Sequence, residues 1–499
     1  MIPDNFRRRT PVIVIFAVAI AGAVIVITPI ILCLLVIRRI VLIFAQKTRP
    51  DLDGFVHGSH NVFAMEPSPV TPVSNILVLA LWEGQISPEK FQQNMEERVL
   101  NLRSPDGNNF LYKGLRRTWT NFLGFAFWTS VTNFKIQNHV RTYDYSEIPN
   151  PCSEADIIII KVLGNLAQRG WDSGQSPWEI LIIPNVLVKG VSQTGMVIRF
   201  DHVLGDGYSL MGWMKKLLGS SFTTPNLQQN KARALTAFEK LALFWKIPFD
   251  MAECSLMALF PRSISGYPKK GVTQEPLTVS ISGNIPLDLV KLVRKKFSVS
   301  FVTVIFTVIV GAIGRALELS GQVVPEYLTG GVVVPLPNHP GGMTVHCSYL
   351  LAEFPVLRTQ SSVGRLLEIQ KVTTELTKSS AALGYLYMGR VISYFPTFIR
   401  QRLLKALVYR DLPLTITNFP TTSSKESMDG HEVLYIAAIL GTPPSMGLTI
   451  TTGGVNGRQR FNFSIHDNVF TTPEASMRLG KFVEEELQEL VNATNGSGE

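Results

Sequence analysis

Uncharged apolar residues dominate the beginning of the chain before shorter periodic runs take over. Between Pro11 and Ile37 stand 27 consecutive residues without a charge, most of them Val, Ile, Ala and Leu. As a helix this run would extend about 40 Å, which exceeds the ~30 Å hydrocarbon core of a bilayer. Arg38 and Arg39 follow it in place of a small-residue cleavage site, so we expect an uncleaved helix that spans a membrane once.

The same run allows a second interpretation because Pro29 lies near its middle. The apolar residues up to Ala45 would then bend back as a re-entrant hairpin, and Arg38 and Arg39 would have to reach the membrane surface with their side chains. In either case residues 1–47 form a membrane anchor with basic flanks. Residues 48–73 are polar and interrupted by Pro and Gly, as in a linker.

Alternation of apolar and polar positions predicts a folded body that starts near Ser74. Residues 75–82 are typical of a buried strand, and residues 87–89 (Ser-Pro-Glu) supply a helix N-cap, a proline at the first helical position and an acidic first turn. Apolar side chains alternate again over 196–201, as in a half-buried strand. A helix-like stretch follows at 208–218.

A second group of periodic runs follows a stretch with no clear chemistry. Residues 235–260 are rich in Leu, Phe, Met and Trp and predict a pair of helices, whose apolar surface rests on a membrane, lines a tunnel or is buried between subdomains. Beyond it the patterns predict a strand at 277–282, helices at 286–297 and 303–317, a strand at 332–336, a hairpin of 445–452 with 458–465 around Asn456-Gly457, and a final helix bearing apolar residues from Leu479 to Val491.

These elements favour an α/β protein in which helices cover sheets. We therefore divide the body into an N-terminal subdomain at 74–218, a crossover segment at 219–275 and a C-terminal subdomain at 276–499. A chain of 499 residues is long enough to bury the cores that this division requires.

The positive charge of the chain is concentrated at its amino end. Residues 1–50 carry seven basic residues and one acidic residue, which accounts for +6 of the net +9. The other 449 residues share +3, so we expect no nucleic-acid partner. The four cysteines, at 33, 152, 254 and 347, lack metal-binding spacing and suit a reducing compartment. We therefore predict no metal site.

One polar run stands where a strand ends, and it is the best candidate for chemistry. Asp201 to Gly207 reads Asp-His-Val-Leu-Gly-Asp-Gly, directly after the alternating strand. A neutral imidazole at such a junction could deprotonate an alcohol near physiological pH, and Asp206 could hold the loop by an ion pair or backbone hydrogen bonds. Gly205 and Gly207 permit tight turns and close approach. The plain alternative is an Asp-Gly turn that closes a strand.

The run from Asp201 to Gly207 resembles the HHxxxDG motif of the wax ester synthase/diacylglycerol acyltransferase family. His202, Asp206 and Gly207 match that motif, whereas Asp201 stands where the family has its first histidine. Further similar segments occur in family order, namely Phe134 to Val140, Ser176 to Glu179 with Trp178, Thr417 to Pro420, and Gly447 to Ile450. The family's Asn-Asp pair, expected near Val302-Thr303, is absent, and its Pro-Gly-Pro element reads Pro420-Thr421-Thr422 here.

The resemblance implies two chloramphenicol acetyltransferase-like subdomains that form a tunnel, preceded here by the membrane helix. It also implies transfer of a long-chain acyl group from acyl-coenzyme A to a fatty alcohol or diacylglycerol, with His202 as base and no cofactor beyond this co-substrate. Asp206 and Gly207 would support the motif, and Asn418 and Trp178 would lie near the active centre. The product would be wax ester or triacylglycerol.

Two further functions stay open. Asp201 and the altered elements fit a catalytically inactive acyl-CoA- or lipid-binding relative, and a sterol or polyol could be the acceptor instead. The pair His346-Cys347 could be read as a nucleophile and its base, although neighbours on a strand point to opposite faces. The sequence has no GxSxG, P-loop or HExxH motif, which argues against a hydrolase of the α/β type, an NTPase or a zincin.

Charge around the apolar run predicts where the body lies. More positive charge follows the run than precedes it, which weakly favours a cytoplasmic body. Coenzyme A thioesters are cytosolic, so we expect a single-pass protein of the endoplasmic reticulum with a cytoplasmic catalytic body, the plasma membrane being the alternative. Glycosylation at the sequons of Asn462, Asn492 or Asn495 would reverse this topology.

Overall fold

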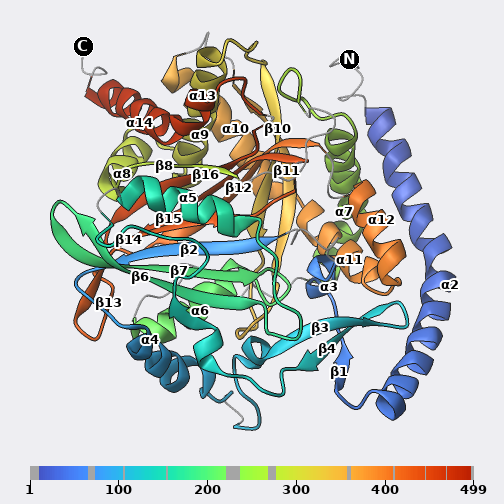
Figure 1. Cartoon of the computed structure of the whole chain (residues 1–499). Helices are drawn as coiled ribbons and strands as arrows, with labels where there is room; N and C mark the ends of the chain where they lie inside the picture. The colour runs from blue at the N-terminus through green and yellow to red at the C-terminus, as the bar shows by residue number, and fades with distance from the viewer. Residues whose placement is uncertain are drawn as a thin grey trace.

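The computed structural model describes residues 10–65, 74–104, 107–152, 155–220, 236–267, 277–356, 361–407, 411–443, 445–467 and 469–495. Two large sheets with helices around them make up the body, and one long helix runs along its side (Figure 1). The basic residues before Thr10, the end of the predicted linker (66–73) and two parts of the predicted crossover (221–235 and 268–276) lie outside the described residues.

The first sheet has six strands in the order β13-β14-β2-β7-β6-β5. Their bounds are Ser427–Met428, His431–Leu440, Asn75–Trp82, Val191–Asp201, Trp178–Val188 and Val140–Thr142. Every residue of β2 is buried, because β14 and β7 pair with its edges and a hydrophobic cluster covers each face. The predicted strand at 75–82 is therefore confirmed as the centre of this sheet.

The second sheet has the order β11-β10-β12-β15-β16-β8, with β9 also paired to β16. The strands are Cys347–Pro355 (β11), Tyr327–Pro335 (β10), Leu412–Thr421 (β12), Met446–Val455 (β15), Arg458–Ile465 (β16), Thr278–Ile281 (β8) and Ile285–Pro286 (β9). The predicted hairpin is confirmed, since β15 and β16 pair antiparallel around Asn456 and Gly457, which both have positive φ as a type I′ turn requires.

Helices pack on both sheets and between them. They are α4 (Pro88–Met95), continued by a π-helical turn (Glu96–Leu100), α5 (Ala155–Ala167), α6 (Gly207–Leu218), α7 (Ala237–Leu259), α8 (Leu287–Lys296), α9 (Phe301–Leu319), α10 (Ser362–Lys378), α11 (Ala381–Ile392), α12 (Thr397–Leu407), α13 (Pro473–Met477) and α14 (Leu479–Asn495). The hydroxyl of Ser87 accepts a hydrogen bond from the Lys90 amide at 3.3 Å, so the predicted N-cap of α4 is present. The pair of helices predicted at 235–260 is instead the single helix α7, with Pro248 inside it.

Two strands leave the second half of the chain and complete the first sheet. β14 pairs antiparallel with β2, from Val433 opposite Trp82 to Leu440 opposite Ile76, and β13 extends this edge. The predicted boundary between subdomains at 219–275 therefore separates the chain in sequence but not in space. Residues 427–440 belong to the sheet that carries the His202 loop.

A single helix, α2 (Thr10–Thr48), occupies the predicted membrane anchor. It is long and apolar enough to cross a membrane, and it continues through Pro29, so the re-entrant hairpin is not observed. The similarly apolar α9 is mostly buried and is a core helix of the body. The predicted linker contains two elements, β1 (Leu52–Phe55) and α3 (His60–Phe63), and β1 joins a small sheet with β4 (Phe125–Ser130) and β3 (Arg117–Phe122).

The sequon at Asn462 lies inside β16. Its side chain is buried and donates to the Thr451 carbonyl oxygen at 3.1 Å. The folded protein therefore cannot present Asn462 to a glycosylating enzyme, and only Asn492 and Asn495 can report topology.

A buried ion cluster joins three helices on the outer side of the second sheet. Glu486 of α14 is 1% exposed and pairs with Arg315 of α9, whose Nε lies 2.6 Å from its carboxylate, and with buried Arg365 of α10. An ion taken out of water is stable only with its partners in place. Gly311 makes room for the pair, because a Cβ at that position would lie 2.2 Å from the Glu486 carboxylate.

We expect Glu486→Gln to destabilise the folded chain by about 3 kcal/mol, because it leaves the buried Arg365 guanidinium without a counter-charge. Chemical denaturation of the full chain in detergent would measure the change. Glu489→Gln is the matched control, since Glu489 also pairs with Arg315 but its side chain is 45% exposed. Its loss should cost less than about 1 kcal/mol. Equal effects of the two substitutions would contradict the assignment of Glu486 as the centre of the cluster.

Candidate active site

His202 follows the last residue of β7 and begins the loop into α6. Its amide donates to the Ser74 carbonyl oxygen at 2.9 Å, which extends the pairing of β7 with the start of β2 by one residue. The strand predicted to end at Asp201 therefore ends there, and the imidazole follows directly after the last residue of this interior strand. Part of the residue's surface is accessible, whereas Nδ1 is buried and has no hydrogen-bond partner among the residues that the structure describes.

The imidazole is packed against residues that sequence patterns did not single out. Phe63 of α3 stacks on it, with ring centroids 3.9 Å apart and planes 10° from parallel. His60, one helical turn earlier, lies 2.7 Å by Nδ1 from the Val203 carbonyl oxygen of the His202 loop. The segment predicted to be a linker thus forms one wall of the site.

The electrostatic surroundings keep His202 neutral. Burial lowers the pKa of His202 to about 4, nearby His60 adds to the lowering, and the Asp206 carboxylate and the main chain oppose it in part. A neutral imidazole is the form that can accept a proton. The ring is therefore in its basic form throughout the physiological pH range.

Asp206 is buried, and its carboxylate is bonded on both oxygens. As N-cap of α6 it accepts from the Ser209 amide at 2.9 Å, and it accepts from the His346 amide at 2.7 Å. The third partner is His339, whose Nε2 lies 3.2 Å from the Asp206 carboxylate. Because the Nδ1 of His339 accepts a hydrogen bond from the Gly341 amide, its Nε2 is the protonated nitrogen and donates a hydrogen bond to Asp206. Burial alone would raise the pKa of Asp206, but these bonds lower it overall.

The Asp206 bonds connect the two halves of the chain. His339 and His346 both lie in the connection between β10 and β11 of the second sheet, whereas Asp206 and Ser209 follow the first sheet. The hydroxyl of Ser209 also donates to the Thr344 carbonyl oxygen at 2.7 Å. Asp206 thus holds the two subdomains together, because both of its carboxylate oxygens accept hydrogen bonds from protein donors.

Asp201 occupies the position of the family's first histidine. One carboxylate oxygen accepts from the Val203 amide at 2.8 Å, which fixes the turn that contains His202. Burial raises the pKa of Asp201 to about 7, while the Val203 bond and Arg199 lower it in part. The side chain therefore acts locally on the loop backbone, and it carries less than a full negative charge near neutral pH.

Gly207 and Gly205 are required by close packing, not by unusual backbone angles. A Cβ on Gly207 would lie 2.2 Å from the Phe419 ring, and one on Gly205 would lie 2.8 Å from the Ser209 Cβ. Neither glycine is among the residues with positive φ. The space that we expected a substrate to approach at Gly207 is occupied by Phe419, which β12 brings across from the second sheet.

Asn418 precedes Phe419 on β12 and faces the neighbouring strand β15. Its Oδ1 accepts from the hydroxyl of Thr452, the residue directly opposite it in the parallel pair. The amide is therefore held in one orientation, with Nδ2 as the group that it can offer to a ligand. Because Phe419 contacts Gly207, the structure brings the Asn418 strand to the start of α6.

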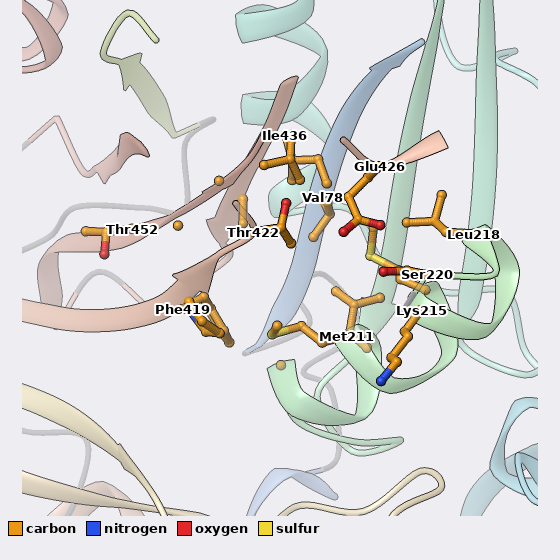
Figure 2. A pocket seen from close by; sticks show the side chains of 18 of the residues that line it. Val78, Met211, Lys215, Leu218, Ser220, Phe419, Thr422, Glu426, Ile436 and Thr452 are labelled. Atoms are coloured by element: carbon orange, nitrogen blue, oxygen red, sulfur yellow. The ribbon is translucent and has the colours of Figure 1, made fainter. Parts of the chain in front are cut away.

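An apolar cavity lies between the sheets beside this contact (Figure 2). Part of it is open to solvent, and most of its wall comes from β2, α6, β12, β14 and β15. Gly207 is one of its lining residues, and Val78, Met211, Phe419 and Ile436 are others (Figure 2). Its lining is almost entirely apolar, so it fits a hydrocarbon chain better than a charged ligand.

Trp178 lies away from this cavity. It is buried on β6, stacks on His139 with centroids 4.6 Å apart, and donates from Nε1 to the Leu115 carbonyl oxygen at 2.7 Å. His139 in turn lies 2.7 Å by Nδ1 from the Trp178 carbonyl oxygen. The similar segments around residues 134–140 and 176–179 are thus brought together, in a core stack beside a polar crevice.

The pair His346-Cys347 does not form a nucleophile with its base. His346 Nε2 lies 2.9 Å from the Pro337 carbonyl oxygen, and burial raises the pKa of the Cys347 thiol far above its usual range. A thiol with a raised pKa is a poor nucleophile because little thiolate is present.

The amino-terminal helix reaches the site through one shared carbonyl group. Arg38 of α2 and Asn61 of α3 both donate to the Ser393 carbonyl oxygen, at 3.3 and 2.8 Å. The Arg38 guanidinium also lies over the Phe55 ring, 3.9 Å from its centroid. Because Phe63 of the same short helix stacks on His202, the position of α2 and the position of the imidazole are set by one continuous set of contacts.

One family model matches part of the second half of the chain. Residues 346–491 match the WS/DGAT C-terminal domain, a range that contains Asn418 but not the His202 loop. No curated protein matches the full sequence.

Similar folds cover most of the chain. The wax ester synthase/diacylglycerol acyltransferase from Marinobacter aquaeolei VT8 has 14% sequence identity and a TM-score of 0.54, over 88% of this chain and 98% of that one. The first condensation domain of the CDA synthetase has 12% identity and a TM-score of 0.55, over 88% and 96%. The TRI3 trichothecene 15-O-acetyltransferase from Fusarium sporotrichioides has 10% identity and a TM-score of 0.52, over 88% and 95%.

These likenesses confirm the predicted fold, a mixed α/β architecture of the acetyltransferase and condensation type with an apolar amino-terminal helix in addition. Domain and fold together support an acyltransferase. The resemblance seen in the sequence is supported by both comparisons: residues 346–491 match the C-terminal domain of the wax ester synthase/diacylglycerol acyltransferase family, and the fold is similar to that of a solved wax ester synthase/diacylglycerol acyltransferase.

Proposed function

We propose that the protein is a membrane-attached acyltransferase that moves a long-chain acyl group from acyl-coenzyme A to a fatty alcohol or diacylglycerol, forming wax ester or triacylglycerol. The observation that carries the proposal is the neutral His202 on a loop that leads to Gly207, one of the residues lining an apolar cavity between the sheets. A base on a loop that reaches an apolar cavity suits an alcohol and an acyl group that are both apolar.

The proposed reaction is a direct transfer with His202 as the single base. Nε2 is the nitrogen left to meet the acceptor, since Nδ1 is buried. Nε2 takes the hydroxyl proton as the acceptor oxygen attacks the thioester carbonyl carbon, which forms the new C–O bond. When the C–S bond breaks, the imidazolium returns the proton to the leaving thiolate. Acyl-coenzyme A enters as co-substrate, and the reaction requires no cofactor.

Other residues would position the base and the intermediate. The bonds of Asp206 to Ser209, His346 and His339 hold the loop that carries His202, so we assign Asp206 a positioning role, with Gly207 giving Phe419 its space. Asn418 is proposed to donate from Nδ2 to the intermediate, because Thr452 already holds its oxygen. Such preorganised donors stabilise developing charge without reorganisation.

The attachment proposed here uses α2, with the body on the cytoplasmic side of the endoplasmic reticulum. Acyl-coenzyme A is supplied from that side, and both acceptors partition into membranes. An acyl acceptor held in the bilayer would reach a site whose wall, α3, contacts the same carbonyl group as α2.

We expect His202→Ala to lower the rate of acyl transfer by about 10²- to 10⁴-fold, the range for loss of a positioned base. The full chain and the variant would be expressed in cells that lack neutral-lipid synthesis and receive labelled palmitate with a long-chain alcohol or diacylglycerol. Labelled wax ester or triacylglycerol is the readout. His431→Ala is the control, because His431 lies beside the other end of β2 from the His202 loop, where its Nδ1 is 2.8 Å from the Glu83 carbonyl oxygen.

Equal product from the His202→Ala variant and the parent would remove His202 as the base. Absence of product from a well-folded parent, together with acyl-coenzyme A binding measured by calorimetry, would favour the inactive binding protein that Asp201 first suggested. Product from an added sterol alone would retain the transfer and change the acceptor.

The pH dependence of kcat/KM should show the lowered pKa of His202. Because a base acts in its neutral form and the pKa of this one is about 4, activity should stay level from about pH 8 down to about pH 5 and fall only below that. Phe63→Ala would expose the ring to water, so its pKa should move up towards the usual ~6.5 and the fall should begin at higher pH. A parent profile that already halves near pH 6.5 would contradict the burial of the base.

The cavity should set the length of the acyl chain or alcohol. Ala438 lines it from β14, so Ala438→Phe would fill part of the volume and exclude the far end of a long chain. Each methylene that is no longer buried costs about 0.8 kcal/mol, or roughly fourfold in kcat/KM. Rates with a series of acyl-coenzyme A donors and alcohols measure this, with the shortest substrates as internal control. An unchanged length preference for both substrates would place the chains elsewhere.

A further inference from the structure

Helix α2 lies against the body from its first turns to its last. Its buried residues are Ala17 near its beginning and, at intervals of three or four, Leu34, Arg38, Val41 and Ala45 near its end. Ile20 packs on the cluster around Met251 of α7, and Val41 and Ala45 pack on Phe127 and its neighbours. The helix thus runs along one side of the molecule (Figure 1).

This arrangement conflicts with a helix that crosses the bilayer upright. Ala17 and Ala45 are both almost fully buried against the body, and 28 residues of helix separate them by about 42 Å. A hydrocarbon core is only ~30 Å thick. An upright α2 would either lose its contacts or carry α7, with its charged Lys246 and Asp250, into the hydrocarbon. Lying parallel to the membrane, α2 keeps every contact.

Helix α7 exposes an apolar stripe beside α2. Phe238, Leu241, Trp245 and Phe249 are 79%, 55%, 62% and 41% exposed, and their spacing of three, four and four places them on one face. Phe244 adds a further exposed ring in edge contact with Trp245. A complete capping box at Thr236 and Glu239 starts the helix, so these turns are well formed without being covered.

The chemistry of this side of the molecule fits lipid. Large apolar side chains of α2 are exposed around most of its circumference, which lipid chains can solvate and a single protein partner cannot. The hydroxyl of Thr28, though exposed, donates to the Val24 carbonyl oxygen at 2.7 Å, as a polar group must within hydrocarbon. Soluble monomeric proteins rarely expose a contiguous apolar surface as extensive as that of α2 and α7 together.

Charge on the neighbouring helices favours an anionic surface. Neither α2, α11 nor α12 contains an Asp or Glu, whereas each contains basic residues. Arg39, Arg390 and Arg402 are exposed, one on each helix. Basic residues at the edge of an embedded apolar face attract acidic lipid headgroups.

We propose that the protein is monotopic: α2 lies in the plane of the membrane within one leaflet, the stripe of α7 formed by Phe238, Leu241, Trp245 and Phe249 enters the same leaflet, and Arg39, Arg390 and Arg402 face acidic headgroups. The proposal rests on this surface and is independent of the transfer reaction. It replaces the single crossing expected from length and composition alone.

Site-directed labelling of the full chain tests the two parts separately. In a Cys33→Ser background reconstituted into sealed vesicles of phosphatidylcholine with phosphatidylserine, Pro11→Cys reports the side on which the helix begins. Only molecules whose body faces outward, identified by protease accessibility, are scored. A membrane-impermeant maleimide added outside should label Pro11→Cys equally with and without detergent. Labelling only after detergent would overturn the in-plane helix, and the parent without added cysteine sets the background.

The depth of α7 is measured with a fluorophore at Trp245→Cys. We expect a blue-shifted emission and strong quenching by lipids that carry a spin label on the acyl chain. Val323→Cys, at a position 76% exposed in the connection between α9 and β10, should show water-like emission without quenching. Water-like emission from both positions would overturn insertion of α7. Retained acyl transfer or an unchanged elution volume would establish that each variant is folded, so loss of activity alone leaves the membrane result readable.

Discussion

The buried carboxylate of Asp206 holds the two halves of the molecule in the register that the candidate site needs. An ionised group taken out of water has to be matched by donors, and those donors come from its own helix and from the connection between β10 and β11. With this connection fixed, Phe419 lies against Gly207, and both residues line the cavity. His202 keeps its place directly after the end of β7. A residue that touches no substrate in our scheme therefore decides where the chemistry can occur.

A second series of contacts connects the amino-terminal helix to the His202 imidazole. The Ser393 carbonyl oxygen receives Arg38 from α2 and Asn61 from α3, and α3 supplies the ring that stacks on His202. This stacking contributes to the burial that keeps the imidazole neutral. The segment expected to be only a linker thus forms a wall beside the base, and the helix expected to be only an anchor is connected to that wall through Ser393.

Local patterns predicted the elements whose cause is local. The alternation before Asp201 and the turn at Asn456-Gly457 could be read from the chain because strand periodicity and positive φ are properties of neighbouring residues. Distant pairings left no such mark. No local pattern in residues 427–440 predicts that they complete the first sheet beside β2. No local pattern in residues 60–63 predicts that Phe63 covers His202. Asn418 lies beside Phe419 on the strand that reaches Gly207, whereas Trp178 belongs to a core stack, because similarity of sequence does not state which face of a strand a side chain occupies.

The carbonyl group shared by Arg38 and Asn61 also has a consequence for biosynthesis. Arg38 leaves the ribosome 355 residues before Ser393, so α2 is complete while its acceptor does not yet exist. A cytosolic chain would have to close this long loop by a search in three dimensions, at a substantial cost in entropy. A nascent chain whose first helix already lies on the membrane surface searches in two dimensions close to that surface, and the exposed apolar helix is shielded from other nascent chains during the delay. The same helix would then tether the chain during folding before it supports α3, the wall beside His202.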